Sequence, residues 1–193
     1  MPTRRSGFTV AAVAVLLAGA TTAVAAQSGG HRPATPAAQN TAHRTGSPAS
    51  LTASGIEHLS SAVDLPAGTW TDVPLEVTLR RPGVYDLDAD VRGSLQGDPP
   101  VNTYITARLW NVTTGAAVPD SERFVYQIVN SNAGDAPQGG NQTAPISERI
   151  RVTKPTTIRL QALRTDSVGT ATDAQIASDA FGRTSLRYQW AGF

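Results

Sequence analysis

The side chains that could do hydrolytic chemistry in this chain of 193 residues gather around one histidine. His58 is the only histidine after residue 50, and its sequence neighbours include Glu57, Ser60, Ser61 and Asp64. A serine, a histidine and an aspartate can form a triad in which the histidine takes the proton of the serine hydroxyl. Such triads are normally assembled from distant segments, whereas these neighbours lie along one strand or turn. The pattern therefore favours a solvated histidine over a catalytic one.

Paired carboxylates are a second possible source of chemistry, because two of them about 5 to 9.5 Å apart in a cleft can hydrolyse glycosidic bonds. The possible members are Glu76, Glu122, Glu148 and Asp179. Glu76 lies in a plain alternating run, where it is expected on a solvent face, and no glycosidase carboxylate motif is present. We therefore expect a protein that is not an enzyme and has no catalytic residues.

Aspartates give two candidate calcium sites. The run Asp86-x-Asp88-x-Asp90 resembles the start of a calcium loop, but Val91 and Gly97 stand where glycine and a closing glutamate are needed. Calcium favours carboxylates and carbonyls on irregular backbone. The preferred metal ligands are therefore three aspartates in segments expected to be loops: Asp166, Asp173 and Asp179.

The composition limits the partners and the chemistry. The net charge of +1 gives no reason to expect nucleic acid or acidic lipid as a partner. The absence of cysteine excludes disulfides, thiolate metal sites and cysteine nucleophiles. A single lysine among many arginines, with abundant Ala, Thr and Gly, is typical of a GC-rich bacterium such as an actinobacterium.

The first 53 residues read as an export signal followed by a tether. Arg4 and Arg5 precede an apolar run over residues 10–20, and the small-x-small triplet Ala23-Val24-Ala25 predicts cleavage of a signal peptide of residues 1–25. An uncleaved anchor is the alternative, but the run is shorter than the roughly 20 residues of a spanning helix. Residues 26–53 are rich in Ala, Pro, Thr and Gly, which predicts a disordered linker. We therefore expect a secreted or surface-attached protein with no membrane span after cleavage.

Residues 54–193 show the period-two alternation of β-strands. Leucine and valine alternate with polar residues from Leu75 to Leu79, Arg81-Pro82-Gly83 predicts the turn of a hairpin, and the alternation resumes from Val84 to Val91. Further strands are expected at 104–110, 124–129, 146–152, 157–163 and 186–190, with long loops at 130–145 and 165–179. About eight short strands with one apolar face each predict an all-β, antiparallel two-sheet jelly-roll sandwich.

Two aromatic side chains are candidate interface anchors. Tyr104 and Trp110 lie on the side of their strand opposite Ile105, Ala107 and Leu109. A large aromatic on a solvent face is a common anchor of a protein interface. Either side of this strand could be the core side, so burial under the second sheet is the alternative.

The order of elements resembles the jelly-roll heads of the complement and tumour-necrosis-factor superfamily. The similarity is carried by Gly83-Val84-Tyr85, the segment from Val152 to Leu160, and the step from Phe181 to Leu186. Two departures are the absence of a collagen-like stalk and Pro155-Thr156 in place of a Gly-Asp turn. The resemblance implies a non-catalytic trimer that binds other molecules through loops or subunit seams.

The sequence thus predicts a secreted or cell-surface binding and assembly module of this class, as a homo-oligomer with an extracellular protein or glycan as ligand. The alternative is a carbohydrate-binding or carbohydrate-active jelly-roll module that uses a loop calcium site.

Overall fold

The computed structural model describes residues 53–193. The predicted signal peptide, residues 1–25, and nearly all of the predicted linker lie outside the described residues. Within the described part, no helix is long and apolar enough to cross a membrane.

The described chain is built from β-strands joined by turns. In chain order these are β1 (Ser54–His58), β2 (Val63–Asp64), β3 (Thr71–Leu79), β4 (Gly83–Gly97), β5 (Val101–Asn111), β6 (Ala116–Ala117), β7 (Arg123–Asn130), β8 (Gln138–Val152), β9 (Thr156–Val168), β10 (Ala171–Ile176), β11 (Ser178–Asp179), β12 (Gly182–Arg183) and β13 (Ser185–Gly192).

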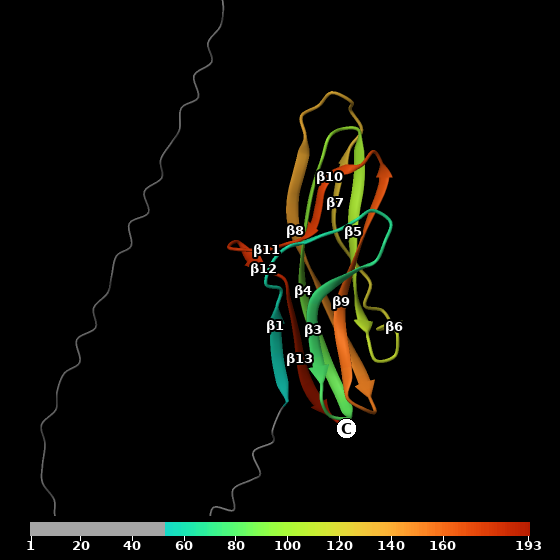
Figure 1. The fold of residues 1–193 in the computed structure, drawn as a ribbon, viewed down its shortest axis with the longest axis vertical. Coiled ribbons are helices and arrows are strands. Elements are labelled where there is room, and N and C mark those ends of the chain that lie inside the picture. The colour runs from blue at the N-terminus through green and yellow to red at the C-terminus, as the bar shows by residue number, and fades with distance from the viewer. Residues whose placement is uncertain (1–52) are drawn as a thin grey trace, which may run out of the picture. The chain divides into compact units, whose positions relative to one another are not determined.

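Two antiparallel sheets pack face to face (Figure 1). The first sheet has the order β1-β13-β4-β8, with β10 beside the second half of β4 and β2 beside β10. The second sheet has the order β3-β9-β5-β7, with β6 on the end of β5. The two sheets, β1-β13-β4-β8 and β3-β9-β5-β7, have the strand orders of a double Greek key, which is the jelly roll. This confirms the predicted all-β jelly-roll sandwich.

The hydrophobic core is formed by apolar residues that alternate with polar residues along the strands. Tyr85, Leu87, Ala89 and Val91 point inward from β4, while the aspartates between them point to solvent. On β5 the inward side carries Ile105, Ala107 and Leu109, all fully buried. Each strand has one apolar face, so the free energy of burial is gained only where the two sheets cover one another.

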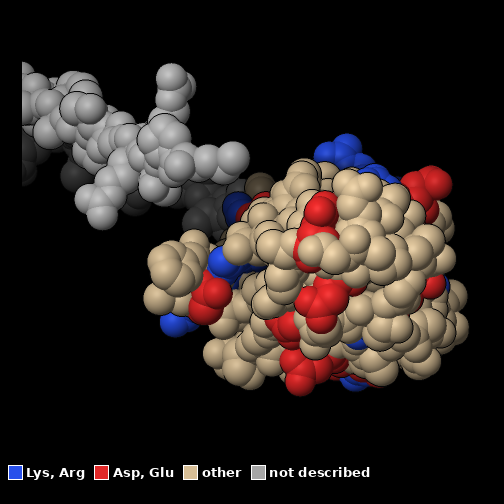
Figure 2. Space-filling view, turned by 90° about the horizontal axis from the view of Figure 1, so that it is seen from above, with Lys and Arg blue, Asp and Glu red and all other residues tan. Residues whose placement is uncertain are grey.

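The aspartate run of β4 belongs to an ion-paired outer face and is not a calcium loop. Arg149 of β8 donates to Asp86, and Arg187 of β13 pairs with Asp90. The hydrogen bond from Arg149 holds the pKa of Asp86 below its ordinary value. Charges of the two signs are also mixed on the end of the domain in Figure 2, where acidic groups spread over the middle and basic groups lie toward the margins.

The prediction of two long loops was wrong in part. The segment 130–145 was expected to be irregular, yet β8 begins at Gln138 and pairs with β4 from there to Val152. The segment 165–179 was also expected to be a loop, yet β9 runs to Val168, and β10 and β11 follow. In both segments the backbone pairing of a neighbouring strand fixes an extended conformation that glycine, asparagine and aspartate do not favour by themselves.

Candidate binding surface

The outer face of the β3-β9-β5-β7 sheet carries a group of aromatic side chains around one arginine. The core side of β5 is the side of Ile105, so Tyr104 and Trp110 point outward and are half-buried. The alternative, burial of these two rings under the second sheet, is thereby excluded. We call the outward residues Trp70, Tyr104, Arg108, Trp110 and Phe124 the aromatic face.

Arg108 contacts two indole rings at once. Its guanidinium carbon lies 3.8 Å from the ring centroid of Trp70 and 4.8 Å from that of Trp110. A guanidinium within about 6 Å of an indole centroid is attracted by the ring quadrupole. The arginine therefore holds both indoles in place, although Trp70 precedes β3 and Trp110 lies at the end of β5.

A polar ladder extends from this arginine across two neighbouring strands. The Nε of Arg108 donates to Oε1 of Gln161 at 2.9 Å, and Nε2 of Gln161 donates to Oδ1 of Asp72 at 2.7 Å. Arg159 completes the ladder by pairing with Asp72 and Glu76. The hydrogen bond to Glu76 is the main reason why the pKa of Arg159 is raised. The ladder orients the arginine, and through it the indoles, before any ligand arrives.

The other part of the aromatic face is apolar. Tyr104 and Phe124 stack with ring centroids 5.9 Å apart and an interplanar angle of 26°. Phe124 is 54% exposed, and two exposed valines, Val129 and Val168, lie opposite Asn102 at the same end of the sheet. The face thus has an apolar part along β7 and a polar part with two indoles along β9 and β3.

Arg108 and two aromatic members of the aromatic face were not predicted. Trp70 lies in a segment without alternation, and only the folded register brings it to Arg108, 38 positions further along the chain. Phe124 belongs to a predicted strand, but a register shift between Ile105 and Thr106 decides that it meets Tyr104. The one available signal was that both are large aromatics beside polar residues.

The three predicted calcium ligands engage separate partners. Asp166, on β9, is held by Arg164 and by the hydroxyl of Thr103. Asp173 lies on β10 of the other sheet. Asp179 lies on β11 and pairs with Arg92. The structure therefore does not bring them together, and among residues 53–193 no three His, Asp or Glu side chains are placed to hold a metal ion.

The candidate catalytic histidine lies at the edge of the first sheet. His58 is exposed at the end of β1, where its backbone is opposite Ser185. In the part of the chain that the structure describes, its side chain makes no hydrogen bond to Ser60, Ser61 or Asp64. The neighbours in sequence are thus not assembled into a triad.

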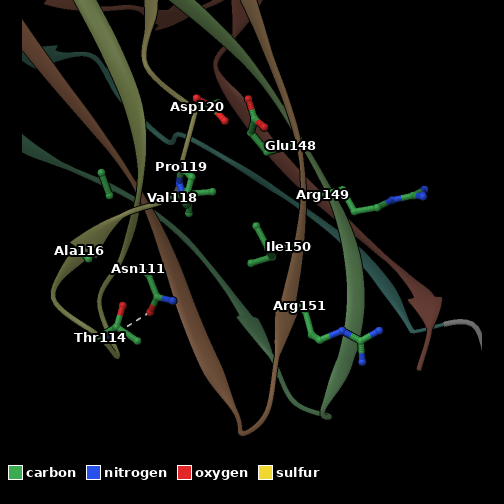
Figure 3. Close-up of a pocket in the computed structure, with 11 residues that line it drawn as sticks. Asn111, Thr114, Ala116, Val118, Pro119, Asp120, Glu148, Arg149, Ile150 and Arg151 are labelled. Carbon is green, nitrogen blue, oxygen red and sulfur yellow. Dashed lines mark hydrogen bonds between the residues drawn. The ribbon is translucent and has the colours of Figure 1, made fainter.

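A groove opens between the edges of the two sheets, where β6 and the segment before β7 face β8 (Figure 3). Its volume is about 510 Å³. Ile150 of β8 points toward Val118 and Pro119 across the groove, and the carboxylates of Asp120 and Glu148 lie at one end. We call this the edge groove.

Comparison with known proteins finds similar solved structures but no similar family model or curated sequence. No family model matches the chain, and no curated protein matches its sequence. Similar solved structures include that of the infectious bursal disease virus Gx strain, with 17% identity over 74% of this chain and 33% of that chain and a TM-score of 0.45. The VP2 subviral particle of the same virus has 14% identity over 73% of this chain and 33% of that chain, with a TM-score of 0.44. The chain spans about a third of the length of these viral structures.

Proposed function

We propose that this protein is a secreted or cell-surface, non-catalytic module that works by binding and assembly. The export signal and tether of the first 53 residues support its location outside the cell. The similarity of its motifs to complement and tumour-necrosis-factor heads supports a bacterial, secreted version of these heads that assembles as a homotrimer. The partner beyond the trimer is an extracellular protein or glycan.

The observation that carries the proposal is the aromatic face. Tyr104 and Phe124 are already stacked, and Arg108 already holds Trp70 and Trp110. Association normally costs about 0.5 to 1.5 kcal/mol for each flexible side chain that becomes fixed. Rings that are fixed before contact avoid much of this cost, so the face is suited to a subunit seam with Tyr104 and Trp110 as anchors.

A carbohydrate ligand is the second candidate, and the polar part of the aromatic face favours it. Indole rings next to hydrogen-bonding side chains can stack on a sugar ring while Gln161 and Asp72 bond to its hydroxyls. The calcium part of this alternative gains no support from the geometry, because the predicted ligands engage separate partners.

The two candidates differ in what happens when one anchor is removed. We expect light scattering of the exported protein to give the mass of a trimer, and Trp110→Ala or Tyr104→Asp to reduce it to that of a monomer. The reason is that a buried aromatic anchor commonly contributes about 2 kcal/mol or more to an interface. Gln189→Ala is the matched control, because Gln189 is exposed on the outer face of the other sheet.

Circular dichroism of each variant should retain the β spectrum, which separates loss of assembly from loss of folding. A monomeric wild-type protein would refute the trimer. In that case, retention on an immobilised polysaccharide that is lost in Trp110→Ala would favour the carbohydrate ligand.

A further inference from the structure

A short hairpin, β11–β12, projects from the side of the sandwich (Figure 1). It carries an exposed aromatic side chain. Phe181 lies at its turn and is 92% exposed. A phenylalanine that gains nothing from burial in its own fold is a candidate anchor for another surface. Arg183, on the same hairpin, is also exposed and forms no salt bridge within residues 53–193.

The hairpin is held in one conformation by an arginine beneath it. Arg92 is only 8% exposed, and its Nη1 donates to Oδ1 of Asp179 at 2.5 Å and to the carbonyl of Gly182 at 3.2 Å. The same carboxylate oxygen accepts the backbone N–H of Phe181 at 2.8 Å. The hydrogen bond from Arg92 is the main cause of the lowered pKa of Asp179, so this carboxylate stays ionised. Phe181 therefore lies on a turn whose conformation is fixed by these hydrogen bonds.

The edge groove offers a complementary surface. Val118, Pro119 and Ile150 give it an apolar lining, and Asp120 lies at its rim with no salt bridge to any described residue. Strand β6 is paired only with β5, and β8 only with β4, in the described sheets. Both strands therefore leave a backbone edge beside the groove that can accept an added strand.

We propose that the β11–β12 hairpin of one copy docks into the edge groove of a second copy. Phe181 then covers the apolar lining, and Arg183 meets Asp120. The volume of about 510 Å³ lies within the range of sites that hold a compact group, about 300 to 1,000 Å³. The opposite charges at the rim of the groove and on the hairpin set the orientation.

The two surfaces lie on opposite flanks of the domain. In Figure 1, β11 and β12 are on the side of β1, and β6 is on the other side. A contact between two different surfaces of the same chain is heterologous, and it repeats into a ring or a filament. This contact goes beyond the proposed trimer, because none of its residues belongs to the aromatic face.

The lack of cysteine in the chain allows a direct test by cross-linking. Exported protein with Arg183→Cys is mixed with protein carrying Asp120→Cys, and disulfide-linked dimers are measured on a non-reducing gel. The control mixes Asp120→Cys with Gln189→Cys, whose cysteine is exposed on the outer face of β13. We expect a linked dimer in the first mixture and roughly tenfold less in the control, and adding Phe181→Ser to the first mixture should lower its yield by a similar factor.

Charge reversal provides an independent readout. Light scattering at rising concentration should show species above the trimer, which Arg183→Asp removes and the additional change Asp120→Arg restores. Equal cross-linking in both mixtures, or larger species that persist in Phe181→Ser, would overturn the proposed contact. Phe181→Ser should leave the trimer intact and Trp110→Ala should leave the hairpin contact intact, so failure of one contact is distinguishable from failure of the other.

Discussion

Replacing Asp166 with asparagine is expected to lower the free energy of unfolding by about 3 kcal/mol. Asp166 and Arg164 form a pair whose side chains are 12% and 10% exposed, with Nη2 to Oδ2 at 2.7 Å. Arg164 also donates to the carbonyl of Ala171, which fixes it under the β9–β10 turn. Removing the negative charge leaves a buried guanidinium without a counter-ion, and that is more costly than losing one hydrogen bond.

Urea denaturation at pH 7 measures this effect. The matched control is Asp86→Asn, because Asp86 pairs with Arg149 on an exposed face and surface pairs contribute about 1 kcal/mol or less. A loss in Asp166→Asn no larger than that in Asp86→Asn would show that Arg164 is adequately solvated without its partner.

The same pair predicts how stability depends on pH. Burial by itself raises the pKa of Asp166, but the hydrogen bonds from Arg164 and Thr103 together outweigh it, so the folded pKa lies below the ordinary 3.8. The unfolded state therefore binds a proton at a higher pH than the folded state. The contribution of Asp166 is fully present above the unfolded pKa and is lost as the pH falls through the folded one. The acid-induced loss of stability should accordingly be smaller in Asp166→Asn.

Gly83→Ala is expected to cost about 3 kcal/mol, from backbone strain and overpacking together. Gly83 has a φ of +143°, a conformation open almost only to glycine. A Cβ there would overlap Nε1 of the Trp190 indole and lie 2.5 Å from the carbonyl oxygen of Gly192. The start of β4 must therefore shift away from β13.

The control Gly192→Ala separates the cost of backbone strain from the cost of steric overlap by the added Cβ. Gly192 has a φ of +130°, close to that of Gly83, but a Cβ at this position meets nothing within 4 Å. We expect it to cost about 1 to 3 kcal/mol by strain alone, and less than Gly83→Ala. Equal losses in thermal or urea unfolding would mean that the Trp190 indole and the Gly192 carbonyl both move aside at little cost.

Gly83 and Tyr85 illustrate what the sequence could predict. The turn at Arg81-Pro82-Gly83 and the alternation after it were placed correctly, because proline, glycine and apolar periodicity act within a few residues. The expectation of a hairpin there was wrong, because the turn carries the chain from β3 in the second sheet to β4 in the first and the two strands do not pair. Tyr85 is fully buried, and its hydroxyl donates to the carbonyl of Arg81 at 3.0 Å, which closes the same turn. Both residues of the resemblance motif therefore have a local, structural role.

Features that depend on distant pairing were not predictable. The residues from Gln138 to Asn141 have the composition of a loop, yet they extend β8 because the second half of β4 supplies partners for them. The indoles of Trp70 and Trp110 share one arginine only because β9 lies between β3 and β5. The sequence of a single chain does not specify which strands pair or in what register. Tyr104 and Trp110 could therefore be placed on one face of a strand, but their neighbours could not.

The first and last strands of the sandwich are neighbours, since Ser54 of β1 lies opposite Gln189 of β13 and the carbonyl of Ala53 accepts the N–H of Trp190 at 2.8 Å. Entry and exit of the chain are thus at the same pole of the domain, where Figure 1 marks the C-terminus. A fluorophore or fusion partner attached at Phe193 would emerge beside the start of β1, and the turns at the opposite pole would be displayed away from it. A pulling force applied to the chain before Ser54 would be carried first by the five-residue β1 strand and its pairing with β13, so a stretched domain should begin to open at this edge.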